Sequence, residues 1–134
     1  MRNAAVMILM TGTLMACGGS GDVCQQSESL LQSEANKVQS CGSDAGADES
    51  LILADLTNVQ QNCETDLKSC TAADMSALSG AVSCEQSLVS TIQCQWFLEA
   101  DTTTDPSFVA YQNATTTCEA KTANVSAACG GGTM

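Results

Sequence analysis

The sequence predicts an all-α domain, an up-down-up-down four-helix bundle stapled by disulfide bonds. Apolar residues recur every three or four positions in four segments of similar length, as they do along one face of a helix. No segment alternates apolar and polar residues over the length that a strand needs. The connections are short, which favours antiparallel neighbours, and nine cysteines in 134 residues can supply cross-links.

The first two predicted helices span residues 22–40 and 48–69, and residues 42–46 between them are typical of a turn. Asp22 and Gln25 give the first helix a start like a capping box. Its apolar face consists of Cys24, Leu31, Ala35 and Val38. The face of the second helix is more regular and consists of Ile52, Leu56, Val59, Cys63, Leu67 and Cys70.

The third predicted helix spans residues 72–99. Thr71 is its cap and Asp74 its third residue, an arrangement that starts helices well. Glu85 is the one polar break in an otherwise apolar face. That face consists of Met75, Leu78, Val82, Val89, Ile92 and Trp96.

The fourth predicted helix follows an acidic, threonine-rich loop at residues 100–105 and runs to about Cys129. Asp105 can cap it, and Pro106 suits the first helical position. The three threonines at 115–117 are poor helix formers, so this is the weakest of the four helices. Its predicted face consists of Phe108, Tyr111, Thr115, Cys118, Thr122, Val125 and Cys129.

Charge and composition exclude several classes of function. Four Lys and Arg residues against fifteen Asp and Glu give a net charge of −11, and histidine is absent. Such a chain cannot bind nucleic acid by neutralising phosphates. It also lacks the residue that Ser-His-Asp catalysis and histidine-containing zinc sites require. We therefore expect no nucleic-acid partner, no metal, no cofactor and no enzyme activity.

The N-terminus is typical of an export signal. Arg2 precedes an uncharged run over residues 4–16, which is shorter than the roughly 20 residues that cross a bilayer but suits a signal peptide. The sequence Leu14-Met15-Ala16-Cys17 resembles the lipobox of bacterial lipoprotein precursors, and a glycine-rich tether follows it.

The resemblance implies cleavage after Ala16 and acylation of Cys17, which would attach the protein to a membrane through its acyl chains. Gly18, directly after the acylated cysteine, favours the outer membrane over the inner one. Ordinary cleavage with a free thiol at Cys17 is the alternative. The expected order is a signal peptide at 1–16, the lipidated cysteine and tether at 17–21, a helical cysteine-rich domain at 22–129 and a frayed, glycine-rich tail at 130–134.

Assigning Cys17 to lipid leaves eight cysteines, an even number that can pair in an oxidising compartment. Facing residues of an antiparallel hairpin have numbers that average to its turn, and two cysteine pairs meet this condition. The other four cysteines end helices, two at each end of the bundle. The predicted disulfides are Cys24–Cys63, Cys84–Cys118, Cys41–Cys94 and Cys70–Cys129.

Other chemistry for these residues has little support. The closest cysteines, Cys63 and Cys70, are too far apart for the usual zinc spacing or for a Cys-x-x-Cys redox site. Carboxylates within residues 44–49 and 101–105 could ligate calcium, but neither loop matches an EF-hand. We interpret them as solvated turn and cap residues.

The aromatic residues Trp96, Phe97, Phe108 and Tyr111 flank the loop between the third and fourth helices. They could form a ligand pocket or a partner-contact patch. They could instead plug one end of a core that is poor in large residues, and this is the interpretation we favour.

These observations predict a lipid-anchored, extracytoplasmic structural or protein-interaction module of the cell envelope, with an envelope protein as its partner. The alternative is a helical carrier or binding protein for a small apolar ligand, held in a cavity that the many small residues leave between helices. A carrier would release its ligand into organic solvent, whereas an interaction module would not.

Overall fold

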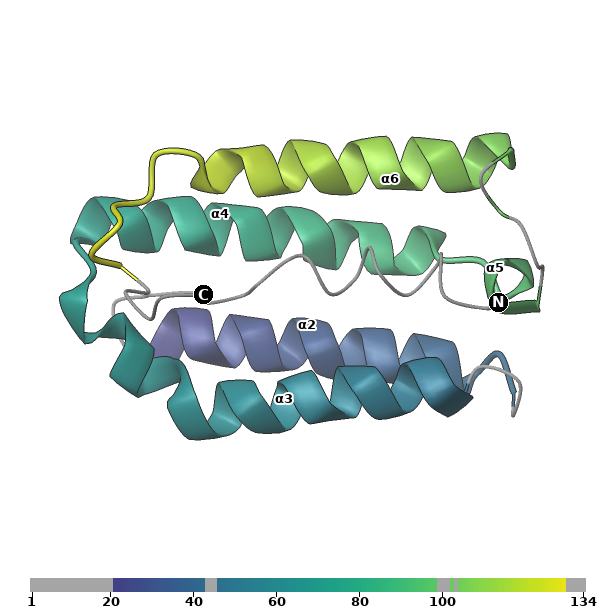
Figure 1. Cartoon of the computed structure of the whole chain (residues 1–134), viewed down its shortest axis with the longest axis horizontal. Helices are drawn as coiled ribbons and strands as arrows, with labels where there is room; N and C mark the ends of the chain where they lie inside the picture. The colour runs from purple at the N-terminus through teal and green to yellow at the C-terminus, as the bar shows by residue number, and fades with distance from the viewer. Residues whose placement is uncertain (1–20, 43–45, 99–101, 103, 130–134) are drawn as a thin grey trace.

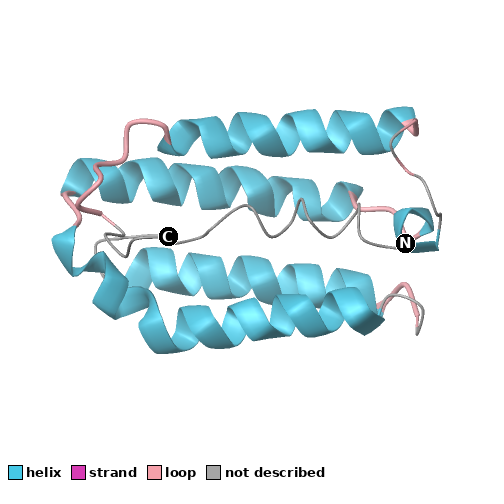
Figure 2. Ribbon diagram, viewed as in Figure 1, coloured by secondary structure: helices cyan, strands magenta, loops and turns pink. Residues whose placement is uncertain are grey.

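The computed structural model describes residues 21–42, 46–98, 102 and 104–129, and within them every regular element is a helix (Figure 2). The predicted signal peptide, Cys17 and the tail at 130–134 lie outside the described residues. The elements are α2 (Gly21–Gln39), α3 (Gly46–Asp66), the 3-10 turn η2 (Leu67–Ser69), α4 (Ala72–Leu88), η3 (Val89–Thr91), α5 (Gln95–Leu98), α6 (Pro106–Glu119) and η4 (Ala120–Thr122).

The four long helices alternate in direction, so the all-α bundle predicted from the sequence is confirmed. They lie in the order α3, α2, α4, α6 (Figure 1). Two antiparallel hairpins, α2 with α3 and α4 with α6, therefore meet along α2 and α4. Since both of these helices run in the same direction, the interface between the hairpins is a parallel one.

The register of this interface is set at two points. Ser79 donates a hydrogen bond to the Gln26 side chain at 2.8 Å, and Cys41 is bonded to Cys94; both pairs are separated by 53 residues. Because the separation is equal at both points, α2 and α4 run parallel, and residues whose numbers differ by 53 lie at about the same level.

The third predicted helix is interrupted, which corrects the expectation of one helix over residues 72–99. The α-helix ends at Leu88, a 3-10 turn follows, and Ile92 leaves the helical conformation with φ −58° and ψ 129° before α5 begins. Val89, Thr91 and Ile92 are β-branched and lose rotamer freedom in a helix. The break brings Cys94 to the end of α2, where its Cα lies 5.0 Å from that of Cys41.

The fourth helix is shorter than predicted, because α6 ends at Glu119 and only η4 and turns follow. The prediction of a helix to about Cys129 is therefore wrong. Two long-range bonds fix the last described residues instead: the Ser126 amide donates to Asp74 at 2.7 Å, and Cys129 is bonded to Cys70. Both contacts direct the chain back to the start of α4.

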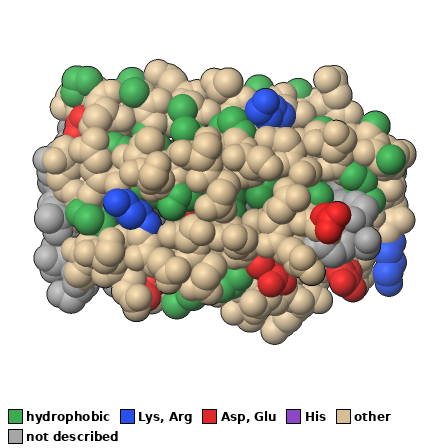
Figure 3. Space-filling view, turned by 180° about the vertical axis from the view of Figure 1, so that it is seen from behind, with side chains coloured by type: hydrophobic (Ala, Val, Ile, Leu, Met, Phe, Trp, Pro, Cys, Tyr) green, Lys and Arg blue, Asp and Glu red, His purple; other side chains and the backbone are tan. Residues whose placement is uncertain are grey.

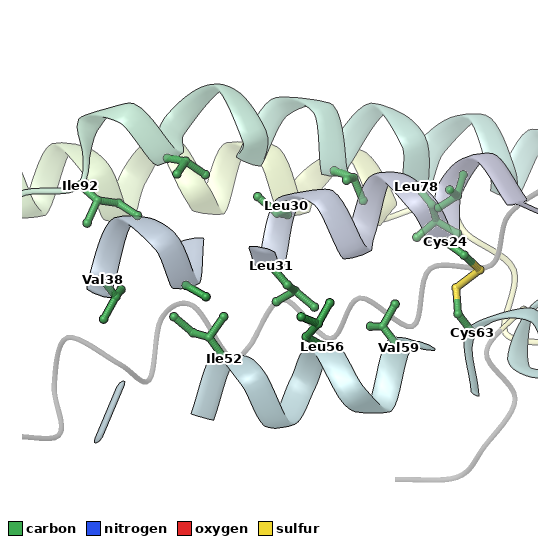
Figure 4. Packing of buried hydrophobic residues seen from close by; sticks show 14 of the residues in the cluster. Cys24, Leu30, Leu31, Val38, Ile52, Leu56, Val59, Cys63, Leu78 and Ile92 are labelled. Carbon is green, nitrogen blue, oxygen red and sulfur yellow. A yellow bond between two sulfur atoms is a disulfide. The ribbon is translucent and has the colours of Figure 1, made fainter. Parts of the chain in front are cut away.

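The core depends on α2, which packs between its two neighbours (Figure 4). Leu30 points toward α4 while Leu31 points toward α3, since consecutive helical residues face about 100° apart. Gly42, in the turn after α2, has a φ of 95°, a conformation that residues with a side chain rarely adopt. Other buried residues in this cluster include Val38, Ile52, Leu56, Val59, Leu78, Val82 and Ile92.

Candidate functional site

The cysteine framework has the connectivity that the bundle geometry predicts. Its disulfides are Cys24–Cys63, Cys41–Cys94, Cys70–Cys129 and Cys84–Cys118, with Cα atoms 5.9, 5.0, 4.4 and 5.4 Å apart. Two of them close the hairpins, one within α2 and α3 and the other within α4 and α6. The other two join the hairpins near opposite ends of the bundle. All eight cysteines after Cys17 are thereby paired.

The four aromatic side chains are buried at the α5 end of the bundle. Trp96 packs edge-on against Phe108, with ring centroids 5.3 Å apart, and lies 5.2 Å from the Tyr111 ring. All four, Phe97 included, are at most 8% exposed. They cannot present the partner-contact patch that was one of the two interpretations. Their burial agrees with the hydrophobic plug.

A group of polar side chains from α2, α4 and α6 lies inside the bundle, and Glu34 is the one member of this group that the predicted helix faces did not include. Glu34 of α2 is only 6% exposed, and Glu85 of α4 is partly buried. Tyr111 and Thr115, both buried, come from α6, and the Thr115 hydroxyl donates to the Tyr111 carbonyl at 3.1 Å. We call Glu34, Glu85 and Tyr111 the interior acid cluster.

Burial dominates the electrostatics of this cluster. It raises the pKa of Glu34 to about 8, and the carboxylates of Glu85 and Asp55 contribute to the increase. Burial also raises the pKa of Glu85 to about 7, with a further contribution from Glu119. The pKa of Tyr111 is raised by burial first and by Glu34 second. The cluster therefore holds protons near neutral pH that ordinary carboxyl groups release.

A sequence signal for Glu34 exists. Glu34 lies four residues after Leu30 and four before Val38, so it occupies the buried face of the first helix as Glu85 occupies that of the third. Both positions interrupt an apolar pattern, and a carboxyl group at such a position must be neutralised or paired. Only the parallel register of α2 and α4 shows that these two interruptions lie at similar levels on neighbouring helices.

Asp74 forms a second polar centre, at the start of α4. Its carboxylate accepts from the amide and hydroxyl of Thr71, both at 2.8 Å, and from the amide and hydroxyl of Ser126 at 2.7 and 3.0 Å. The predicted capping box is confirmed, because the Asp74 amide donates in return to Thr71. The Ser126 amide, followed by the Thr71 donors, lowers the pKa of Asp74 to about 2.

We expect Asp74→Asn to release the segment around Ser126 from α4. An amide has one acceptor oxygen, so it cannot replace a carboxylate that accepts four hydrogen bonds. Exchange of the Ser126 amide hydrogen, followed by NMR, should accelerate by about tenfold or more. Asp105→Asn is the matched control, since Asp105 caps α6 through Ser107 and Phe108 and does not contact Ser126. Unchanged exchange at Ser126 in Asp74→Asn would contradict this assignment.

Of the carboxylates considered as calcium ligands, Asp44 and Asp101 lie outside the described residues, and the others form no cation site within them. Asp105 is a helix cap whose pKa is lowered to about 2 by the Ser107 hydroxyl and amide, with Gln95 and Phe108 contributing less. Burial raises the pKa of Asp48. Within the described part of the chain, no group of three or more Cys, His, Asp or Glu residues is arranged to hold a metal ion.

A hollow between α2 and α4 has a volume of about 120 Å³. Ligand sites for drug-sized molecules are larger, about 300–1,000 Å³, and mostly apolar. The volume of this hollow is therefore too small to favour the carrier hypothesis. The lining residues are Gln26, Ser29, Val82, Ser83 and Gln86.

On the face shown in Figure 3, charged and hydrophobic side chains are scattered among backbone and other side chains and form no single patch of one chemical type. Leu51 and Leu53 on α3 and Val109 on α6 are the large hydrophobic residues that the described chain exposes most. None of the helices described in the structure combines the length and the apolar character required to cross a membrane.

The fold and the disulfides define the structural class of the protein, which is a small four-helix bundle made of two helical hairpins. One disulfide closes each hairpin, and two further disulfides join the hairpins to each other. Comparisons of the chain with protein-family models, curated proteins and solved structures find no match. The residues of the chain are therefore the basis for any functional proposal.

Proposed function

We propose that the chain is a lipid-anchored module of the cell envelope that acts through contacts with other proteins and not through catalysis. One observation carries this proposal: eight cysteines pair with one another, and the one left over is Cys17 at the end of the lipobox-like sequence. An odd cysteine in an exported protein needs a separate role, and acylation supplies one.

The disulfide framework supports an extracytoplasmic location, because disulfides form and persist in oxidising compartments. Acyl chains on Cys17 would then hold the domain at a membrane, the outer one on the basis of Gly18. The sequence at 18–21, Gly-Gly-Ser-Gly, would separate the bundle from the lipid surface as a flexible tether.

The acidic character of the chain suits selection of a partner by charge. The chain has fifteen Asp and Glu residues and only four Lys and Arg residues. Complementary charge accelerates the encounter with a basic partner and disfavours binding of acidic proteins. A basic surface on an envelope protein is the partner chemistry that fits best. The interior acid cluster and the Asp74 centre have no open metal-binding or nucleophilic arrangement, so we assign them to the fold and not to catalysis.

Intact mass of protein extracted from membranes tests the anchor and the framework together. Extraction uses detergent and a thiol-alkylating reagent without reductant. We expect the mass of residues 17–134 plus acyl chains, less the eight hydrogens that four disulfides remove, and no alkylation. Cys17→Ala should remove the mass of the acyl chains, whereas Ser20→Ala in the tether should leave it unchanged. An unacylated mass, or alkylation at several thiols, would overturn the proposal.

Extraction into organic solvent separates the interaction module from the carrier. An interaction module should release no lipid-like molecule, and the fluorescence of Trp96 should not change on extraction. Release of a stoichiometric apolar molecule with a shift in Trp96 emission would favour the carrier instead.

A further inference from the structure

The interior acid cluster lies where the two hairpins meet, and its position follows from the cross-links. The separation of 53 residues that relates α2 to α4 places Glu34 at the level of Ser87, two residues along the chain from Glu85. The Cys84–Cys118 bond fixes α6 against the same part of α4. The cluster is therefore a consequence of register and burial, and it brings together acidic groups from three helices.

The charged surroundings of the cluster are acidic on every side. Asp55 on α3 and Glu85 on α4 both raise the pKa of Glu34. Tyr111 is the titratable group on α6 that interacts with Glu34. Glu119 of α6 acts on Glu85. No cation contributes to the pKa of either glutamate among the described residues. Ionisation would therefore place like charges close together in an interior from which water is largely excluded.

The disulfides determine how the bundle can respond to that repulsion. Each hairpin is closed by its own cross-link, Cys24–Cys63 or Cys84–Cys118. The hairpins are joined by Cys41–Cys94 at one end and by Cys70–Cys129 at the other. Between these two joints, side-chain packing and the Gln26–Ser79 hydrogen bond hold α2 against α4.

We propose that Glu34 and Glu85 form a proton-operated latch between the two hairpins. With both carboxyl groups protonated, α2 and α4 stay packed; with both ionised, the contact between them loosens while the four disulfides retain each hairpin and both joints. The raised pKa values of the two glutamates place this change on the alkaline side of neutrality. The outcome is local opening of an intact, oxidised bundle.

Hydrogen exchange of the oxidised protein tests the latch. Amide protection factors, corrected for the intrinsic effect of pH on exchange, would be compared at about pH 6 and about pH 9, on either side of the transition of Glu34. In the wild type, amides of α2 and α4 near Glu34 and Glu85 should lose protection by about tenfold or more. Amides beside the Cys70–Cys129 joint should change much less. Emission of Trp96, which packs against Tyr111, should change over the same pH range.

Two variants make the test specific. Glu34→Gln keeps the size of the side chain and removes its charge, so the pH-dependent loss of protection in α2 and α4 should fall to a small part of the wild-type loss. Glu64→Gln, on the exposed surface of α3, is the matched control and should behave as the wild type. If Glu34→Gln does not form all four disulfides, Glu85→Gln is measured instead. Because the charge of Glu85 raises the pKa of Glu34, its removal relieves the repulsion and should also reduce the loss of protection.

Three results would overturn the latch. The first is equal protection at both pH values in the wild type, and the second is a loss in α2 and α4 no greater than that of amides that exchange only through global unfolding. The third is a pH-dependent loss that persists undiminished in the variant that lacks the ionisable group at position 34. The latch concerns the bundle alone, so none of these results depends on acylation at Cys17.

Discussion

Reduction of the four disulfides should unfold the bundle. Leu, Ile, Val and Phe make up less than a fifth of the residues after Ala16, a share that with high net charge normally signals disorder. Each disulfide typically contributes about 2–4 kcal/mol by restricting the unfolded chain, so four contribute on the order of 10 kcal/mol. The whole free energy of unfolding of a small domain is about 5–15 kcal/mol.

Circular dichroism at 222 nm measures this directly. In excess reductant, the helical signal should fall to that of the urea-unfolded protein, and removal of reductant under oxidising conditions should restore it. The alkylated, reduced protein controls for reformation of disulfides during the measurement. A cooperative thermal transition in the fully reduced protein would contradict this prediction, because it would show that the apolar core maintains the fold without disulfides.

Removing one disulfide at a time should lower the free energy of unfolding most where the two cysteines are most deeply buried. Cys24→Ala with Cys63→Ala deletes sulfur atoms from residues that are 5% and 6% exposed, so it loses core packing as well as a cross-link. Cys41→Ala with Cys94→Ala deletes half-buried sulfurs. Urea unfolding should show a loss of about 2–4 kcal/mol for the second pair of substitutions and a larger loss for the first. The reverse ranking would contradict the burial argument.

The free energy of unfolding should be greatest in mildly acidic solution. The pKa of Glu34 is raised to about 8 and that of Glu85 to about 7, so between their unfolded values and these values the native state binds more protons than the unfolded state. Stability therefore falls as pH rises through this range. The pKa values of Asp74 and Asp105 are lowered to about 2, so the stability they contribute is lost as pH falls below their unfolded values.

Glu34→Gln should remove most of the alkaline loss. Near pH 7 to 8, burial of the carboxyl group costs on the order of 3 kcal/mol, because its pKa lies several units above the unfolded value. The variant should be more stable than the wild type by a similar amount in urea unfolding at that pH, and the two should converge near about pH 4.5. Glu64→Gln on the surface of α3 should show no comparable gain. A wild-type stability that is level from about pH 5 to 8 would refute the assignment.

Much of the fold follows from local pattern. Capping residues and the spacing of apolar residues predict where all four long helices begin and where the first ends, to within about two residues, and the Thr71–Asp74 and Asp105–Pro106 starts are observed as caps. The same pattern does not predict the break after Leu88 or the end of α6 at Glu119, because a face that continues to recur does not show where the backbone leaves the helix. The contacts that fix these points, Cys94 with Cys41 and Ser126 with Asp74, join segments far apart in the sequence.

The candidate sites divide in the same way. The disulfide connectivity could be predicted because residue numbers show which positions face each other in an antiparallel hairpin. The aromatic plug could be predicted because its four members flank one loop. The interior acid cluster could not be predicted, since Glu34 and Glu85 lie on α2 and α4, which are not consecutive in the chain. Placing them at similar levels requires the parallel register that Gln26–Ser79 and Cys41–Cys94 establish.

The sequence by itself therefore determined the all-helical class, the cross-linking pattern and the start sites of the helices, because each depends on local spacing or on hairpin geometry. Only the tertiary structure decided that the hairpins join through α2 and α4, with α3 and α6 on the outside. That choice depends on how side chains from distant segments pack together. It also places Glu34 and Glu85, which local pattern already assigns to the inner faces of their helices, on two neighbouring helices.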